Sequence, residues 1–157
     1  MHPYVLVAPS LTAGTLERLL HTIPEARFHE RPDPNRFTII EEIAHLADWE
    51  PIFLERIKGA AEQDGYVVTP YDESERAVTQ RYADQPIWQS LEKFRVQREA
   101  NLAYCRSLTE TQLQREVPHP NFGPMRTIDL IGFMGLHDAY HIEHLTHFMG
   151  EKLAGTW

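Results

Sequence analysis

The stretch Thr38–Ile57, TIIEEIAHLADWEPIFLERI, predicts a long amphipathic helix. The Thr38 hydroxyl can cap the first turn, and Glu41 three residues later completes a capping box. After this cap, apolar residues recur at helical spacing on one stripe, namely Ile39, Ile43, Leu46, Ala47, Leu54 and Ile57. We therefore expect a helix that begins at Thr38, ends near Gly59 and packs this stripe into a core.

Three further segments have the same helical periodicity. The first runs from about Ser10 to Ile23, another from Pro86 to Leu108, and the last from Thr127, its expected cap, to about Met149. Proline in a first turn and threonine before an apolar run are both signals of a helix start. The stretch from Glu62 to Asp84 carries too much charge to bury a large surface, so we expect a long connection with one short helix.

The remaining local signals are weaker. Thr109 and Gln112 repeat the capping-box pattern, which predicts one short helical turn. We expect a proline-rich loop at residues 118–124, and Tyr66–Thr69 is the best strand candidate in a sequence with few strand signals. These elements predict an all-α protein with a single domain over residues 1–157. Its expected fold is an up-down-type four-helix bundle with a long crossover between the second and third helices.

Composition and charge narrow the classes of function. Of the 157 residues, 42% are hydrophobic and 24% are charged, which is typical of a soluble globular protein. The net charge of −8 argues against a nucleic-acid partner, which requires a basic face. No run approaches the ~18 apolar residues of a membrane span, and residues 1–10 lack the charged start of a signal peptide. We expect a cytoplasmic protein with no membrane partner.

The histidines are the unusual feature, because the chain contains nine of them. His137, His141 and His144 share the apolar sector of the last helix, and the spacing of the first two suits a divalent metal ion. The alternative is that each imidazole forms a hydrogen bond within the core. A third ligand would have to come from another helix, and His45 is the candidate. It lies off the apolar stripe of its helix, so it faces either a cleft beside the last helix or solvent.

Other polar residues could serve such a site. Arg98 and Asn101 lie on the apolar stripe of the third helix, where a buried arginine requires a partner. Arg98 either pairs with a core carboxylate or lines a pocket for an anionic substrate. Asp48, one turn from His45, either orients an imidazole or is a solvated charge. The single cysteine, Cys105, is expected to be a core residue, so a reacting thiol would have to be a cosubstrate.

Two segments resemble the motifs of the DinB-like metal-binding four-helix bundles, a bacterial superfamily. They are Phe37–Glu50, with the capped helix and His45, and HDAYHIEHL at His137–Leu145. The helix order, the long crossover and the loop before the last helix extend the resemblance over nearly the whole chain. The resemblance implies that His45, His137 and His141 bind the metal, that His144 is a pocket residue beside them, and that the protein is a homodimer.

Three neutral histidines leave coordination positions open on a zinc, nickel or iron ion, as in a catalytic site. The resemblance implies mixed activities, and the first expectation is transfer of a low-molecular-weight thiol to an electrophile. Metal-dependent hydrolysis of a small molecule is the second, and a non-catalytic bundle with a structural metal is the third. A di-iron carboxylate site requires two Glu-x-x-His motifs on helices of the bundle, and within the four expected helices the chain has only Glu42-x-x-His45.

Overall fold

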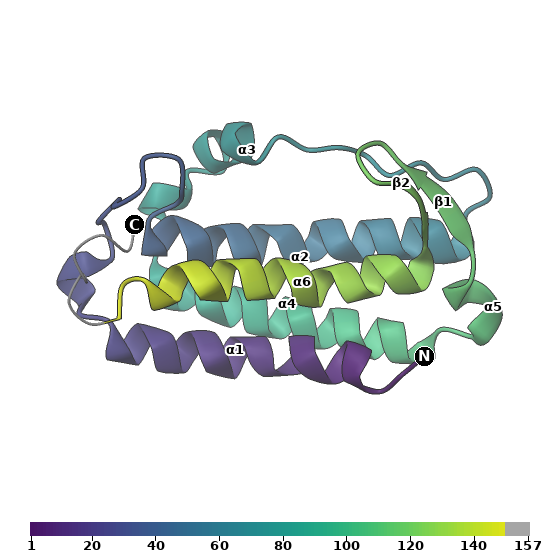
Figure 1. Cartoon of the computed structure of the whole chain (residues 1–157), viewed down its shortest axis with the longest axis horizontal. Coiled ribbons are helices and arrows are strands. Elements are labelled where there is room, and N and C mark those ends of the chain that lie inside the picture. Colours follow the sequence, from purple (N-terminus) through teal and green to yellow (C-terminus); the bar gives the residue numbers. More distant parts are fainter. Residues whose placement is uncertain (150–157) are drawn as a thin grey trace.

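Four long helices lie side by side in the computed structural model, which describes residues 1–149 (Figure 1). Their bounds are Tyr4–Thr22 for α1, Ile39–Glu62 for α2, Ile87–Ser107 for α4 and Thr127–Thr146 for α6. The short elements are Glu25–Arg27 (η1), Glu73–Thr79 (α3), Tyr82–Asp84 (η2), Glu110–Leu113 (α5), Glu116–His119 (β1) and Gly123–Arg126 (β2). The predicted four-helix bundle is confirmed.

The direction of the helices explains the long crossover. Helices α2 and α4 lie next to each other and run in the same direction, so the chain must return along the bundle before α4 can begin (Figure 1). Residues 63–86 make this return and include α3 and η2. Helix α1 packs on α4 and α6, and α2 packs on α4 and α6. On its way back, the crossover covers one side of the α2–α6 pair.

The local signals at the helix starts are mostly confirmed. Thr38 and Glu41 form the expected capping box, and Thr109 and Gln112 form the second one. Pro86 directly precedes α4. Thr127 is the first residue of α6 rather than its cap, because the cap is formed by Arg126 with the Asp129 carboxylate.

Helix α1 begins at Tyr4, six residues before the predicted start, and contains Pro9. A proline weakens the expectation of a helix because it lacks the N–H that continues the hydrogen-bond ladder. Here Pro9 is buried, and its carbonyl accepts a hydrogen bond from Arg98 on α4 at 3.1 Å. Tertiary contact therefore stabilises this part of α1, which the local pattern did not reveal.

The proline-rich segment forms a β-hairpin, and the prediction of a loop there was wrong. Strands β1 and β2 pair antiparallel in a register that places Pro118 opposite Pro124. Neither proline can donate to the ladder, so the segment gives no strand signal of its own. Gly123 has a φ of 74°, a conformation that glycine adopts without strain. Tyr66–Thr69 is not a strand, although the Val68 N–H donates to the carbonyl of Pro118 in β1.

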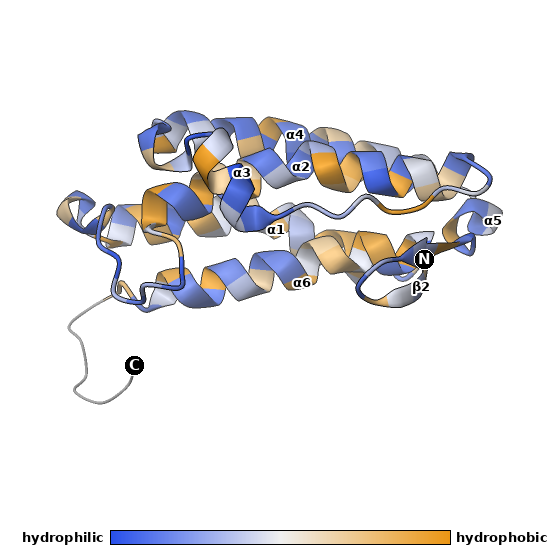
Figure 2. Ribbon diagram, turned by 90° about the horizontal axis from the view of Figure 1, so that it is seen from above, coloured by the Kyte–Doolittle hydropathy of each residue, from blue (hydrophilic) through white to orange (hydrophobic). Residues whose placement is uncertain are grey.

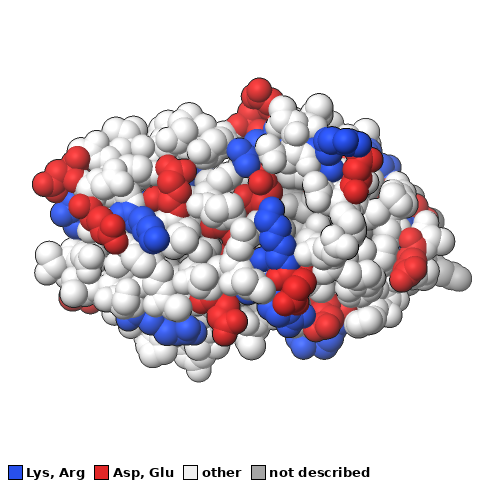
Figure 3. All heavy atoms as spheres, turned by 180° about the vertical axis from the view of Figure 1, so that it is seen from behind, with Lys and Arg blue, Asp and Glu red and all other residues white. Residues whose placement is uncertain are grey.

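The core consists of two apolar clusters near the two ends of the bundle. Each long helix contributes both apolar and polar segments, as Figure 2 shows. On the face in Figure 3, acidic and basic side chains are interspersed, so that face presents no surface of a single charge. None of the described helices is long and apolar enough to cross a membrane. Buried polar residues are concentrated between the two apolar clusters, and they include the predicted site.

Candidate metal centre

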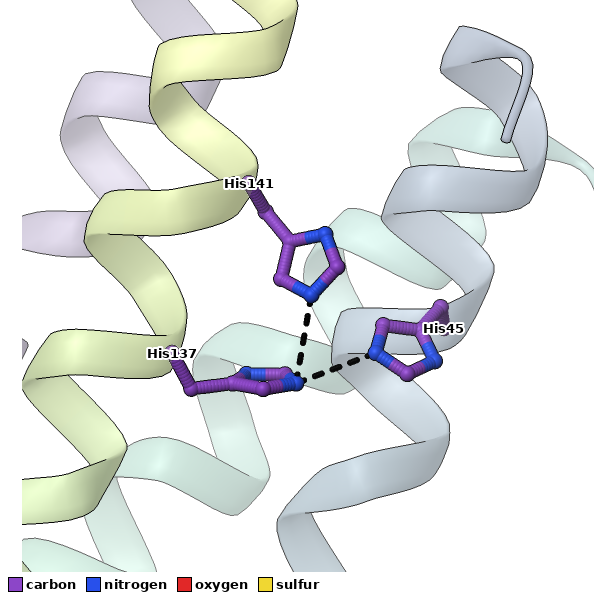
Figure 4. Close-up of side chains that lie close together, drawn as sticks. All are labelled: His45, His137 and His141. Carbon is purple, nitrogen blue, oxygen red and sulfur yellow. Dashed lines mark hydrogen bonds between the residues drawn. The ribbon is translucent and has the colours of Figure 1, made fainter. Parts of the chain in front are cut away.

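Three histidine side chains meet between α2 and α6. His45 projects from α2, and His137 and His141 project from successive turns of α6 (Figure 4). The Nε2 atom of His137 lies 3.0 Å from Nε2 of His45 and 3.2 Å from Nε2 of His141. A ligand nitrogen of each residue lies within 4.8 Å of those of the other two. The structure therefore brings together the three residues expected from the sequence.

The burial of His45 shows which way its side of α2 faces. Its side chain is 0% exposed and packs against aromatic rings of Phe37, Trp49 and Tyr82. The Trp49 ring also stacks on His137, with 5.9 Å between centroids and 9° between the ring planes. The flank carrying His45 thus faces α6 and the crossover, and the surface alternative is wrong.

Burial also keeps two of the imidazoles neutral. Desolvation, assisted by the neighbouring His141, lowers the pKa of His45 to about 3. The same two causes lower the pKa of His137 well below its ordinary value. A neutral imidazole has one N–H donor and one nitrogen lone pair, and the lone pair is the group that binds a metal.

Glu42 on α2 fixes the orientation of His141 and His144. The Nδ1 atoms of both histidines lie within hydrogen-bond distance of the Glu42 carboxylate, one on each oxygen. Burial acts to raise the pKa of Glu42, but the two hydrogen bonds outweigh it and lower the pKa to about 2. Because the ionised carboxylate accepts from Nδ1–H, the neutral form of the His141 ring has its lone pair on Nε2, which points at the other two histidines.

Several buried ring nitrogens have no hydrogen-bond partner among residues 1–149. They are Nδ1 of His45, Nδ1 of His137 and Nε2 of His144. In the cluster itself, three Nε2 atoms face one another, and neutral rings cannot all satisfy such a contact with a single proton each. A divalent cation would satisfy all three lone pairs, so the donor set fits a metal ion.

A small pocket of about 110 Å³ opens beside the histidines. Its walls come from the loop before α2, from α2 itself, from the start of α3 and from α6. The lining residues are Asn35, Arg36, Phe37, Glu42, Glu73, Ser74, Tyr140 and His141. The pocket therefore has room for a small polar molecule next to His141.

His144 is buried at 1% exposure and binds Glu42, one turn beyond His141. It is not part of the group of three. The structure thus places it beside the cluster, as a neighbour that shares a carboxylate with His141.

Asp48 contacts no histidine by hydrogen bond in the described part of the chain. Its Oδ2 accepts hydrogen bonds from Arg76 and from the Tyr82 hydroxyl, each at 2.7 Å. The structure therefore supports neither alternative for Asp48, because its carboxylate is bound by these two groups and its side chain is only 14% exposed. Its contacts tie the crossover to α2.

Arg98 and Asn101 are buried, as the apolar stripe predicted, at 2% and 1% exposure. Arg98 pairs with the carboxylates of Glu50 and Asp138, and Asn101 donates to Glu50 at 2.9 Å. Of the two alternatives for Arg98, the core ion pair is correct. Neither residue lines the pocket beside His141.

Glu42 is the residue of this centre that the sequence analysis missed. It lies three residues before His45, in the motif that we used only to exclude a di-iron site. Residues three apart share one face of a helix, so this spacing could have identified Glu42 as a neighbour of the histidines.

The sequence is similar to a family model and to two named proteins. The family model described as the DinB superfamily matches residues 10–145. A protein of Oceanobacillus iheyensis, named as a candidate metal-dependent hydrolase, is 30% identical over 116 residues, which are 74% of this chain and 67% of that protein. A similarly named protein of Halalkalibacterium halodurans is 29% identical over 130 residues, which are 83% and 75% of the two chains.

A solved structure shows the same fold. It is YfiT from Bacillus subtilis, described as a candidate metal-dependent hydrolase with an unusual four-helix bundle topology. The TM-score is 0.84 at 19% sequence identity, and the match covers 92% of this chain and 83% of that one.

Proposed function

The chain belongs to the DinB superfamily, and we propose that it is a metal-dependent hydrolase of a small molecule. His45, His137 and His141 would hold one divalent ion of zinc, nickel or iron. A metal with three histidine ligands and an open position can activate water as a nucleophile near neutral pH.

The observation that carries the proposal is the convergence of three Nε2 atoms at 3.0 and 3.2 Å. Two of these rings are kept neutral by burial. The third is oriented by Glu42, as carboxylates orient metal-binding histidines in many proteins. The names of the two sequence relatives support hydrolysis as the reaction.

Transfer of a thiol to an electrophile, the first expectation from the sequence, becomes the second candidate. Its support is that a metal with an open position lowers the pKa of a thiol as it does that of water. The thiol would have to be a cosubstrate, because burial raises the pKa of Cys105 to about 12 and the side chain is 0% exposed. The relatives' names favour hydrolysis, which places this candidate second.

Assembly into a homodimer is also proposed. Its support is a set of exposed apolar side chains on α1 and α6, namely Tyr4, Leu11, Leu136 and Tyr140. Light scattering at two protein concentrations would measure the mass, and a single species of one-chain mass would contradict the dimer.

The first experiment is the metal content of untagged protein, measured by mass spectrometry alongside the double variant His137→Ala/His141→Ala. We expect about one divalent ion per chain in the wild type, as one site requires, and none in the variant. The metal-loaded protein is then assayed with a panel of esters and amides, and with a thiol plus an electrophile.

Each result has a distinct meaning. Metal binding with ester or amide cleavage supports the hydrolase, and metal binding with thiol transfer alone supports the second candidate. A wild type that contains no metal and refuses added zinc, nickel and iron would refute both. The histidines would then be hydrogen-bonding groups of a non-catalytic bundle.

A further inference from the structure

The crossover brings one additional carboxylate to the mouth of the histidine pocket. Glu73 is the first residue of α3, and it lines the same pocket as Glu42 and His141. The Asp72 side chain caps α3 by accepting a hydrogen bond from the Glu75 N–H at 2.9 Å. The cap fixes the backbone that carries Glu73.

The crossover is attached to α2 on both sides of Glu73. Before it, the Arg56 guanidinium donates to the Thr69 carbonyl at 2.8 Å. After it, Arg76 pairs with Asp48, one turn beyond His45. These two attachments hold Glu73 in place over the pocket, although it lies on a connection rather than on a long helix.

Glu73 differs from the other carboxylates near the histidines because its oxygens have no partner in the described part of the chain. Glu42 is bound by His141 and His144, and Asp48 by Arg76 and Tyr82. Asp138, the neighbour of His137 in sequence, is bound by Arg98 and Thr12. Among residues 1–149, no hydrogen bond or ion pair engages the Glu73 side chain.

The surroundings of Glu73 suit proton transfer. Desolvation in the pocket raises its pKa, and the carboxylates of Glu42 and Asp72 act in the same direction. His141 and the Arg56 guanidinium oppose this shift without cancelling it. A raised pKa makes the carboxylate a stronger base and brings its pKa closer to neutral pH, where one group can serve as base and then as acid. As an exposed residue, Glu73 can also exchange protons with solvent.

We propose that Glu73 is a catalytic residue of the hydrolysis, which takes a proton from the attacking water and returns it to the leaving group. This inference rests on the proposed function and assigns the proton transfers of that same site. The substrate class that it implies is an ester or amide whose leaving group requires protonation.

The step balances with water as the only co-reactant. The water oxygen bonds to the acyl carbon, and one of its protons moves to a Glu73 carboxylate oxygen. The bond between the acyl carbon and the leaving oxygen or nitrogen then breaks, and its electron pair stays on the leaving atom. That atom takes the proton from Glu73, so the carboxylate is regenerated and one acid and one alcohol or amine are released.

The test compares Glu73→Gln with the matched control Glu75→Gln, which changes an exposed glutamate on the same helix outside the pocket. Zinc-loaded proteins are assayed with phenyl acetate and p-nitrophenyl acetate. Loss of a general acid–base group lowers kcat about 10²- to 10⁴-fold, and we expect a loss in this range on phenyl acetate. The loss should be smaller on p-nitrophenyl acetate, whose leaving group departs without a proton.

Three further readouts separate proton transfer from a structural role. Zinc affinity, measured by chelator competition, should be unchanged in Glu73→Gln. The acidic limb of the wild-type kcat/KM profile should disappear in this variant, and Glu73→Asp should recover part of the rate. Glu75→Gln should match the wild type in every assay.

The outcomes distinguish this inference from the proposed function. If Glu73→Gln keeps the wild-type rate of hydrolysis within about twofold, the loss is far smaller than the loss of a general acid–base group causes. That result would overturn the role of Glu73 and leave the proposed hydrolase intact. A parallel loss of zinc from Glu73→Gln also overturns it, because the residue would then act through the metal. A zinc-loaded wild type that cleaves no ester or amide overturns the proposed function, and the role of Glu73 with it.

Discussion

Two buried polar clusters connect α2 to α6, and they differ in how completely their hydrogen bonds are satisfied. The arginine cluster consists of Arg98, Glu50, Asp138, Asn101 and Thr12. The histidine cluster consists of Glu42, His45, His137, His141 and His144. Both lie between the apolar ends of the bundle, so differences in burial do not explain the contrast.

In the arginine cluster every guanidinium proton has an acceptor. Nε and Nη2 of Arg98 donate to the two oxygens of Glu50, while Nη1 and Nη2 donate to the two oxygens of Asp138. The remaining Nη1 proton goes to the Pro9 carbonyl. Such a network stabilises one arrangement of four helices, and within residues 1–149 it leaves no guanidinium proton of Arg98 free for a ligand.

The histidine cluster leaves ring nitrogens without partners in the described residues, and three of its nitrogens point at one another. Buried polar groups of this kind are costly unless something else binds them. The arginine cluster therefore maintains the fold, whereas the histidine cluster has nitrogens that a ligand can bind.

The largest effect is expected from Arg98→Met. Removing one partner of a buried ion pair costs about 3–5 kcal/mol, because Glu50 and Asp138 would remain buried without a cation. Urea denaturation of metal-free protein at pH 7 measures the loss. Arg95→Met is the control, since its pairs with Glu17 and Glu92 are surface pairs worth about 1 kcal/mol or less. Equal losses in the two variants would contradict the structural role of the arginine cluster.

The pH dependence of stability should separate the clusters. Because burial lowers the pKa of His45 to about 3, the unfolded chain binds this proton below about pH 6.5 while the folded chain does not. The stability of the metal-free protein is therefore complete above pH 6.5 and falls as the pH drops toward 3, by about 3 kcal/mol at pH 4.5. The raised pKa of Glu50, caused mainly by burial, acts in the opposite direction, since its contribution is lost as the pH rises.

Denaturation at several pH values between 6.5 and 4.5 checks this prediction. The variant His45→Gln, which has no titrating group at this position, should show a shallower slope than the wild type. Glu42 does not interfere, because its pKa of about 2 places its own loss of stabilisation below pH 4.5. Identical slopes would mean that His45 is not held in its neutral form.

A smaller effect is expected from Glu42→Gln. An amide has a single acceptor oxygen, so only one of His141 and His144 can still donate to it, and the orientation of the ring nitrogens is weakened. Loss of such a partner lowers metal affinity about 10- to 100-fold, as measured by chelator competition. Glu143→Gln, an exposed change on α6, is the control. Unchanged affinity in Glu42→Gln would show that the carboxylate does not support the metal site.

Features with a local cause could be predicted from the sequence. The capping box of Thr38 and Glu41 requires only neighbouring residues, and the position of Pro86 before a helix does too. Arg98 and Asn101 were recognised because polar residues on an apolar stripe must be buried with partners. The resemblance to the DinB-like proteins added the identity of the third histidine.

Features with a tertiary cause could not be predicted. The side of α2 that carries His45 faces α6 only because of the way the helices are arranged, and helical periodicity does not contain that information. The same holds for Glu73, which lines the pocket of Glu42 and His141 from a different element. The hairpin was missed because Pro118 and Pro124 pair with each other and suppress the strand signal of both strands.

The parallel course of α2 and α4 has a consequence for folding kinetics. In a simple bundle, successive antiparallel helices form hairpins, so most contacts are local and folding is fast. Here α1 packs on α4 and α6, and α2 reaches α4 only after the crossover has closed. The relative contact order is therefore raised, and folding should be slower than in bundles built from hairpins. A fragment that ends before α6 would also leave one side of both α1 and α2 without its partner.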